Sequence, residues 1–448
     1  MKKIVNILLI VCFVLGVTGC GNVKDSDGST YTSKKIDQDQ IEIDKDSEVA
    51  LVENDIKDDA ESDVKFETDN EGENAVNTGM IPELTFASYN VLSNDAMEFV
   101  NNMKIGWNLG NTFDAIDNNT NFKDELKYES IWSGIVTTKE MIDCVKNAGF
   151  NTIRIPVSWH NHVSGEEFII SEVWMNRVQE VVDYAMENEM YIILNIHHDI
   201  GEDYIYPNSQ NLETSKKYIT SIWGQVSARF QDYDEHIIFE GMNEPRLMGT
   251  ENEWWLDSNN KNCIDAVDCI NQLNQSFVDT VRAGAGYNAS RYVMVSGYCA
   301  SPEGALSKQF KLPIDALENK MIVSVHAYTP YRFALQDLSE VGSVSQFSSS
   351  NEKDTRDIDS FMDELYSKYI SLGIPVIIGE FGARDKNTNL LSRVEYATYY
   401  IGAARARGII CCWWDNNSYS GSGENFGILN RKKVEWEYPE IVKGLMKY

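Results

Sequence analysis

Two glutamates, Glu244 and Glu380, each end a short run of apolar residues in the second half of the chain. Glu244 follows residues 237–242, and Glu380 follows residues 376–379. Two carboxyl groups at one site can divide a bond cleavage between them, because a protonated carboxyl acts as a general acid while a carboxylate acts as a nucleophile or base. The two glutamates therefore predict acid–base or nucleophilic catalysis if the fold brings their side chains together.

Other apolar runs also contain or end in polar and aromatic side chains. Such groups destabilise a buried strand end unless they are paired or used. We therefore place them in one candidate site with the two glutamates: Asn111, Arg154, His197, His198, Asn243, His326, Tyr328, Trp413 and Trp414.

Eight short apolar or β-branched runs alternate with longer amphipathic stretches along the chain. This alternation is typical of a parallel sheet, and eight units predict an α/β fold with a single closed (β/α)8 TIM barrel. The active site of such a barrel lies at the carboxyl ends of its strands, where the candidate residues fall. The expected strands are 104–109, 152–157, 191–196, 237–242, 292–295, 321–326, 376–379 and 409–414, and the expected helices include 138–147, 172–188, 212–230, 264–283, 358–372 and 391–407.

Two segments carry a resemblance to a known family. The stretch FEGMNEP at 239–245 and the stretch IIGEFG at 377–382 resemble the two carboxylate signatures of glycoside hydrolase family 5. The order of Arg154, His197 and His326 along the strands also matches this family. The wording GWNLGNTFDA at 106–115 and WWDN at 413–416 is similar to that of its subfamily 4, the bacterial endoglucanases.

The resemblance assigns a role to each candidate catalytic residue. Glu244 is expected to be the acid/base, protonated in the resting enzyme, and Glu380 the nucleophile. The cation of Arg154 is expected to keep Glu380 ionised, so that the pKa values of the two carboxyl groups separate. Asn243 is expected at the sugar 2-hydroxyl, and two residues are expected to orient the carboxylates: His326 and Tyr328.

The remaining candidates are expected to bind the sugar. An indole stacks on the apolar face of a pyranose, while polar side chains take the hydroxyls. Of the adjacent indoles, Trp414 is our choice for the substrate floor and Trp413 for the core, since neighbouring strand residues face opposite ways. Trp107 either lines the cleft or packs beneath the first loop. The expected polar contacts are His197, His198 and Asn111.

The resemblance thus implies a retaining endo-β-1,4-glucanase that needs no cofactor and acts on cellulose, mixed-linkage glucan or xyloglucan. A xylanase or mannanase on the same scaffold remains an alternative. A metal-dependent hydrolase would use His197, His198, Asp199 and His326 as ligands, and a sugar-capture lipoprotein would bind without turnover. Two long segments, 199–211 and 331–355, are expected to line the outer cleft.

Several other residues have structural interpretations. Glu240 shares a strand face with Glu244 and is expected to be a charge paired inside the barrel. The pair Cys263 and Cys269 forms either a disulfide or two buried free thiols. The adjacent Cys411 and Cys412 are expected to pack on opposite faces of one strand.

The N-terminal region predicts export. Residues 1–20 have the form of a signal peptide, with two lysines before an apolar stretch, and VTGC at 17–20 resembles a bacterial lipobox that would place a lipid on Cys20. Residues 21–80 contain 18 acidic and 6 basic residues and are expected to be a disordered acidic linker, which leaves 81–448 for the catalytic barrel. We expect a monomer anchored outside the cell membrane, or otherwise secreted. The net charge of -30 argues against a nucleic-acid partner.

Overall fold

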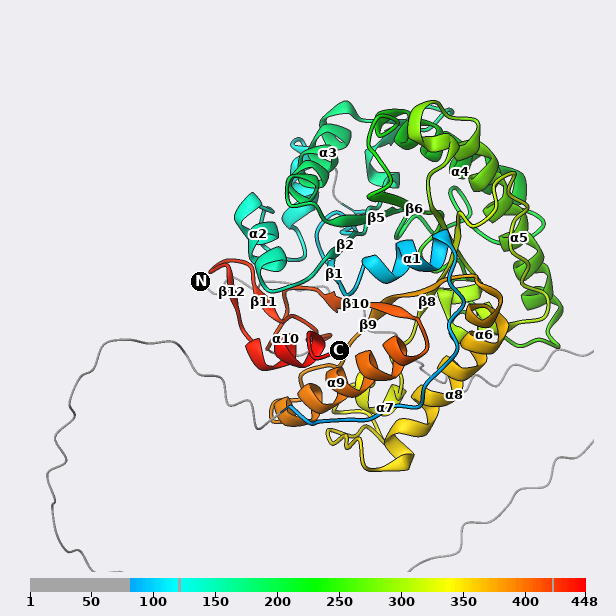
Figure 1. Cartoon of the computed structure of the whole chain (residues 1–448). Helices are drawn as coiled ribbons and strands as arrows, with labels where there is room; N and C mark the ends of the chain where they lie inside the picture. The colour runs from blue at the N-terminus through cyan, green and yellow to red at the C-terminus, as the bar shows by residue number, and fades with distance from the viewer. Residues whose placement is uncertain (1–80, 120–121, 421–422) are drawn as a thin grey trace, which may run out of the picture. The chain divides into compact units, whose positions relative to one another are not determined.

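Eight parallel strands close into a barrel in the computed structural model, which describes residues 81–448 except 120–121 and 421–422. The hydrogen-bonded order is β1-β10-β9-β8-β7-β6-β5-β2, returning to β1, as Figure 1 shows. This is the expected (β/α)8 TIM barrel. Its strands are β1 (Gly106–Leu109), β2 (Thr152–Ile155), β5 (Tyr191–Asn195), β6 (Ile237–Glu240), β7 (Val293–Ser296), β8 (Met321–His326), β9 (Val376–Phe381) and β10 (Ile410–Asp415).

Helices surround the barrel, and the six expected ones are present. They are α2 (Lys139–Asn147), α3 (Glu172–Glu187), α4 (Leu212–Arg229), α5 (Lys261–Arg282), α8 (Glu352–Lys368) and α9 (Leu390–Ala406). Helix α8 begins six residues before the expected position. The side chain of Asn351 accepts a hydrogen bond from the backbone N–H of Lys353, which caps this earlier first turn.

Shorter elements escaped the sequence analysis. The helices among them are α1 (Asp95–Asn102), α6 (Pro302–Leu306), α7 (Tyr331–Ala334) and α10 (Pro439–Leu445). Two small hairpins pair β3 (Val163–Ser164) with β4 (Ile169–Ile170) and β11 (Leu429–Asn430) with β12 (Glu435–Trp436). The 3-10 turns are η2 (Glu125–Ser130), η3 (His160–His162), η4 (Gly286–Ala289), η5 (Tyr298–Ala300) and η6 (Ile370–Leu372).

The apolar core has two parts. The larger part lies between the outer faces of the strands and the helices. The smaller part fills the barrel interior with residues such as Ile193, Ile238 and Cys412, and α1 contributes Phe99 and Met103 to it. Helix α1 thus packs against the interior residues, and in Figure 1 it lies across the middle of the barrel. Helix α1 therefore does not cover the carboxyl ends of the strands.

Strand register aligns the polar residues at those ends. Asn108 pairs with Arg154 across β1 and β2. His326 lies opposite Glu380, at a shift in register between β8 and β9. Because all eight strands are parallel, their polar carboxyl ends meet on one rim of the barrel, as the sequence predicted.

The structure decides between the alternatives for the cysteines. Cys263 and Cys269 are buried free thiols, so the disulfide alternative is wrong. Cys411 lies in the outer core and Cys412 in the barrel interior, which confirms that they occupy opposite faces of β10.

The expected signal peptide, the lipid site at Cys20 and the acidic linker all fall outside the described residues. Within residues 81–448, so far as they are described, no helix has both the length and the apolar character needed to cross a bilayer.

Candidate active site

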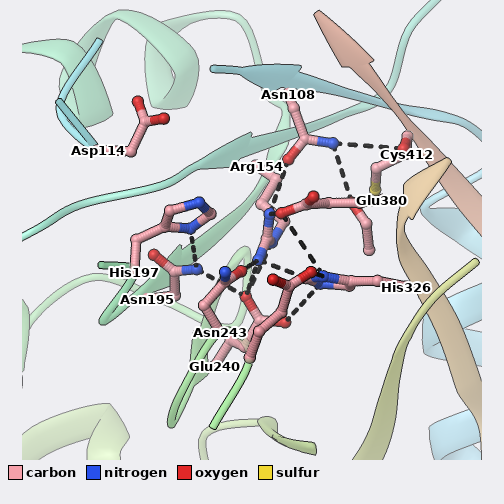
Figure 2. Close-up of polar contacts among 12 residues, drawn as sticks. Asn108, Asp114, Arg154, Asn195, His197, Glu240, Asn243, His326, Glu380 and Cys412 are labelled. Carbon is pink, nitrogen blue, oxygen red and sulfur yellow. Dashed lines mark hydrogen bonds and ion pairs between the residues drawn. The ribbon is translucent and has the colours of Figure 1, made fainter. Parts of the chain in front are cut away.

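Arg154 lies at the centre of a network of polar side chains at the barrel rim (Figure 2). Its buried guanidinium donates to Glu240 at 2.8 Å and to Glu380 at 2.7 Å. It also donates to the side-chain oxygens of Asn108 at 3.0 Å and Asn243 at 2.6 Å. Both carboxylates raise the pKa of Arg154 despite its burial, so the side chain is a permanent cation.

Glu240 completes the base of this network. Its buried carboxylate binds Arg154 and accepts hydrogen bonds from Asn195 Nδ2 at 3.0 Å and from the hydroxyl of Ser324. These contacts confirm the expectation that Glu240 is an internally paired charge.

Glu380 is held from two sides. Arg154 binds its Oε1, and the hydroxyl of Tyr328 donates to its Oε2 at 3.0 Å. Burial and the Glu380 charge raise the pKa of Tyr328 well above its ordinary value, so the phenol keeps the proton that it donates. The Glu380 carboxyl group is thus fixed in orientation and lies in direct contact with the Arg154 cation.

Glu244 has a different partner. His326 Nδ1 lies 2.8 Å from its Oε1. Burial alone would raise the pKa of Glu244, but the hydrogen bond and charge of His326, together with the charges of Arg246 and His198, outweigh burial and lower this pKa. Conversely, burial disfavours the charged imidazole, while the charge of Glu380 and the hydrogen bond to Glu244 raise the pKa of His326. These directions favour an imidazolium–carboxylate pair at rest, whereas the sequence analysis expected the proton on Glu244 itself, which stays a prediction.

The two candidate catalytic carboxyl groups are close together. One ligand-type atom each from Glu244, His326 and Glu380 all lie within 4.8 Å of one another. A spacing of about 5 to 5.5 Å is typical of carboxyl pairs that cleave glycosides with retention, whereas inversion needs about 6.5 to 9.5 Å to admit a water. The arrangement suits a direct attack by one carboxylate.

The hydrogen-bond network determines the tautomer of His197. Asn195 accepts from the backbone N–H of Val157 at its Oδ1, so its Nδ2 faces His197 Nδ1 at 3.1 Å. Nδ1 is therefore an acceptor, and the ring proton lies on Nε2. Burial, together with the charges of His198 and Arg154, lowers the pKa of His197 well below its ordinary value. The ring is a neutral donor suited to a sugar hydroxyl.

Trp414 is the indole that faces this site. Its ring is parallel to that of His197, with the centroids 5.8 Å apart. Gly110 permits this position, because a Cβ there would come within 2.8 Å of the indole. Trp413 instead lies in the outer core and donates to the carbonyl of Phe426.

Trp107 also belongs to the outer core. Its Nε1 donates to Asp415, and the guanidinium of Arg431 lies over its ring. Of the two alternatives, packing beneath the first loop is the one observed.

The remaining predicted residues lie near Asp114. Asp114 accepts from the backbone N–H of Asn111 and of Thr112, and burial raises its pKa to about 6. Asn111 adopts a left-handed backbone with φ of 56°. His198 lies with its ring edge toward His197, and burial lowers its pKa to about 4.

Two groups of side chains among the described residues could hold a metal ion. One consists of Glu244, His326 and Glu380, and the other of Asp114, His197 and His198. The ligand set that the sequence suggested is not brought together, because Asp199 binds His160 and backbone N–H groups while His326 binds Glu244. A metal at the first group would use the same atoms as the two-carboxylate chemistry.

Sequence reasoning missed several members of the network. Asn108 and Asn195 occupy strand ends and bind Arg154 and Glu240, respectively. Asp114 was part of a quoted motif without a role, and Arg246 follows the Asn-Glu-Pro triplet directly. Period-2 alternation along β1 and β5 could have identified both asparagines as facing inward.

The chain is also similar to known proteins. Residues 110–420 match the family model for cellulase, glycosyl hydrolase family 5. The chain belongs to glycoside hydrolase family 5. It is therefore a glycoside hydrolase, as the sequence predicted.

Relatives within family 5 are similar over most of the barrel. A solved family 5 lichenase from Caldicellulosiruptor sp. F32 is 63% identical, with a TM-score of 0.81, over 82% of this chain and 99% of that one. A broad-specificity GH5-4 endoglucanase from Ruminococcus champanellensis, solved with bound cellotriose, is 43% identical, with a TM-score of 0.73, over 80% and 100%. Endoglucanase B of Neocallimastix patriciarum is 41% identical over 83% of this chain and 76% of its own length.

Proposed function

We propose that this family 5 enzyme is a retaining endo-β-1,4-glucanase that cleaves internal bonds of β-glucans by double displacement. The observation that carries the proposal is the proximity of Glu244 and Glu380, with ligand atoms within 4.8 Å of each other. Each carboxyl group has its own partners, which suits two different roles.

In the first step Glu380 is the nucleophile. Its carboxylate attacks the anomeric carbon, while Arg154 and Tyr328 hold its two oxygens in place. The bond to the leaving oxygen breaks with its electron pair, and Glu244 supplies the proton that neutralises this oxygen. His326 returns a proton to Glu244 for this purpose, since the two groups share a 2.8 Å hydrogen bond.

In the second step Glu244 acts as the base. It takes a proton from a water molecule, which attacks the anomeric carbon and releases Glu380. The proton returns to the pair of Glu244 and His326, so the enzyme is ready for another cycle.

The sugar next to the scissile bond would contact three of the remaining residues. Trp414 would stack on its apolar face, and the neutral Nε2–H of His197 would donate to a hydroxyl. Asn243 presents its Nδ2 to the 2-hydroxyl, because its Oδ1 is engaged by Arg154. Contacts at this hydroxyl strengthen in the oxocarbenium-like transition state. His198 and Asn111 would contact the sugar farther from the bond.

Cellulose, mixed-linkage glucan and xyloglucan are the proposed substrates. The likeness to a lichenase at 63% identity and to a broad-specificity endoglucanase supports β-glucans over xylan or mannan. We further propose that the enzyme needs no cofactor, is monomeric and is exported, with a lipid anchor on Cys20 and residues 21–80 as a linker. Mass spectrometry of the N-terminal peptide tests the anchor.

Reducing-end release by the purified protein tests the activity. Carboxymethyl-cellulose, mixed-linkage glucan, xyloglucan, xylan and mannan would be compared, each with and without EDTA. We expect chelator-insensitive release from at least one β-glucan. Loss of activity in EDTA would support the metal hydrolase, and binding without release would support the sugar-capture alternative.

A further inference from the structure

Arg431 is a buried arginine that the two-carboxylate chemistry does not use. It follows β11 directly. Its Nη1 donates to the carbonyl of Gly110 at 2.8 Å and to Thr112 Oγ1 at 2.9 Å. Its Nη2 donates to the carbonyl of Asp415 at 2.6 Å and to Asp415 Oδ1 at 3.2 Å. One side chain thus binds both the segment after β1 and the last residue of β10.

The guanidinium reinforces a backbone contact between these two neighbouring strands. The last pairing between β1 and β10 joins Leu109 to Asp415. One residue farther on, the backbone N–H of Gly110 donates to the carbonyl of Asp415 at 3.0 Å. The two terminal nitrogens of Arg431 hold this same carbonyl and the carbonyl of Gly110. Because the donors of a guanidinium lie in a rigid plane, the two backbones are held at a fixed separation.

Asp415 fixes the position of Arg431 in return. Its Oδ2 accepts hydrogen bonds from the backbone N–H groups of Ile428 at 3.0 Å and Leu429 at 2.9 Å. The same oxygen accepts from Trp107 Nε1 at 3.1 Å. The chain that leads to Arg431 is therefore tied to β10 by the carboxylate that the guanidinium also binds.

This junction supports the indole that faces the candidate site. Trp414 precedes Asp415 on β10, and its ring lies so close to Gly110 that a Cβ there would come within 2.8 Å of it. The same Cβ would lie 2.9 Å from the carbonyl of Asp415. The indole thus packs against the backbone that Arg431 holds. In such a close-packed contact, a displacement of Gly110 would displace the ring as well.

The second acceptor of Arg431 orders the turn after Gly110. Thr112 Oγ1 accepts from Arg431 and donates to the carbonyl of Gly110 at 3.2 Å. The backbone N–H of Thr112 donates to Asp114 at 2.6 Å. A carboxylate oxygen of Asp114 lies within 4.8 Å of a ring nitrogen of His197, and Figure 2 shows both side chains on one side of the Arg154 network. The turn therefore borders the candidate sugar site.

We propose that Arg431 is a positioning residue of the sugar site, which holds Gly110 against β10 and thereby fixes the Trp414 indole for stacking on the sugar. This inference rests on the proposed glucanase function and adds to it a residue that acts without touching the substrate. Neither Glu244 nor Glu380 is among the hydrogen-bond partners of Arg431 in the described part of the chain. Its loss therefore removes no catalytic group, and it acts through the placement of the bound sugar, to which rates are sensitive.

The first experiment is a double-mutant cycle of Arg431→Met and Trp414→Ala. In the wild-type background Arg431→Met should lower kcat/KM on cellohexaose about ten- to a hundredfold, because the indole loses its fixed support. In the Trp414→Ala background the same substitution should cost about threefold at most, because the group that Arg431 positions is absent. Equal fold losses in the two backgrounds would overturn the positioning role.

Arg291→Met is the matched control for the loss of a buried arginine. Arg291 is also fully buried, but it lies just before β7, at the amino end of the barrel strands. Its guanidinium donates to the backbone carbonyls of Phe230, Tyr233, Asp234 and Ile237. Both arginine variants should lower the urea midpoint of unfolding, but only Arg431→Met should lower kcat/KM measured well below that midpoint. A comparable kinetic loss in the Arg291 variant would contradict the proposal, because it would assign the effect to general destabilisation.

Two milder variants test the same role if Arg431→Met does not fold. Arg431→Lys keeps a charge beside Asp415 but lacks the planar fork that binds both carbonyls. Thr112→Val removes one acceptor of Nη1. Each should lower kcat/KM less than Arg431→Met, and the loss should disappear in the Trp414→Ala background. A loss that persists there would overturn the role of Arg431 alone, whereas a wild type that released no sugar from any β-glucan would refute the proposed function itself.

Discussion

His326 Nδ1 and Glu244 Oε1 are joined by a 2.8 Å hydrogen bond, and the same nitrogen lies 3.7 Å from Glu380 Oε1. The imidazole therefore lies between the two candidate catalytic carboxyl groups. Its pKa is raised and that of Glu244 is lowered. The proton that the acid step needs thus resides in the His326–Glu244 pair and favours the histidine at rest.

This pair predicts the basic limb of the pH profile. A raised histidine pKa means that the proton is present at low pH and is lost as pH rises through the folded value, above the ordinary 6.5. In His326→Gln only Glu244 can hold the proton; burial raises the pKa of this carboxyl, but from an ordinary value of 4.5 that lies two units below the 6.5 of an imidazole. The basic limb of kcat/KM should therefore move to lower pH, and a limb that stayed in place would contradict proton storage at His326.

Glu244→Gln should separate the two chemical steps. The variant has no acid, so hydrolysis of β-glucan should fall by roughly 10² to 10⁴. An activated aryl cellobioside should still form the covalent intermediate, because its leaving group needs no proton. Glu380→Gln is the companion variant and should be inactive on both substrates with near-native thermal unfolding. Comparable activity of either variant and the wild type on glucan would refute the assignments.

The buried charges around Arg154 predict a stability test. Arg154→Met leaves Glu240 and Glu380 as buried anions without their cation, which should cost about 3 to 5 kcal/mol of unfolding free energy. Adding Glu240→Gln removes one of these anions and should recover part of the loss. Urea unfolding of the single and double variants measures this difference, and strictly additive destabilisation would argue against the ion pair.

The adjacent indoles of β10 provide a matched pair. Trp413→Ala opens a cavity in the outer core and should lower the unfolding free energy by about 3 to 5 kcal/mol. Trp414→Ala should be much less destabilising and should instead reduce kcat/KM on cello-oligosaccharides. Denaturant unfolding and steady-state kinetics of both variants check the assignment, and the reverse pattern would exchange the two roles.

Much of the fold was predictable from sequence because the barrel strands are continuous apolar runs. The starts of β8 and β9 were predicted correctly for this reason. Helix α1 was not predicted, since its role is to cover the barrel interior through contacts distant in sequence, such as Phe99 with Tyr292. Helix α7 was not predicted either, because its four residues are too few to show a helical periodicity, which needs several turns.

The candidate site was predictable where strand ends carry ionisable residues, as at Arg154 and Glu380. Roles that depend on a partner were less predictable. The resting proton was placed on Glu244 from the role that the resemblance implies, and the sequence alone could not show that Glu244 shares a hydrogen bond with His326. Arg246 was overlooked because its contacts with Trp254 and Glu253 form only when the loop after β6 folds back.

The most direct test of the two-carboxylate account is the anomeric configuration of the first product. Proton NMR during early hydrolysis of a cello-oligosaccharide distinguishes the α and β anomers before mutarotation mixes them. The close spacing of Glu244 and Glu380 predicts that the β anomer appears first. Initial appearance of the α anomer would indicate inversion and would contradict attack by Glu380.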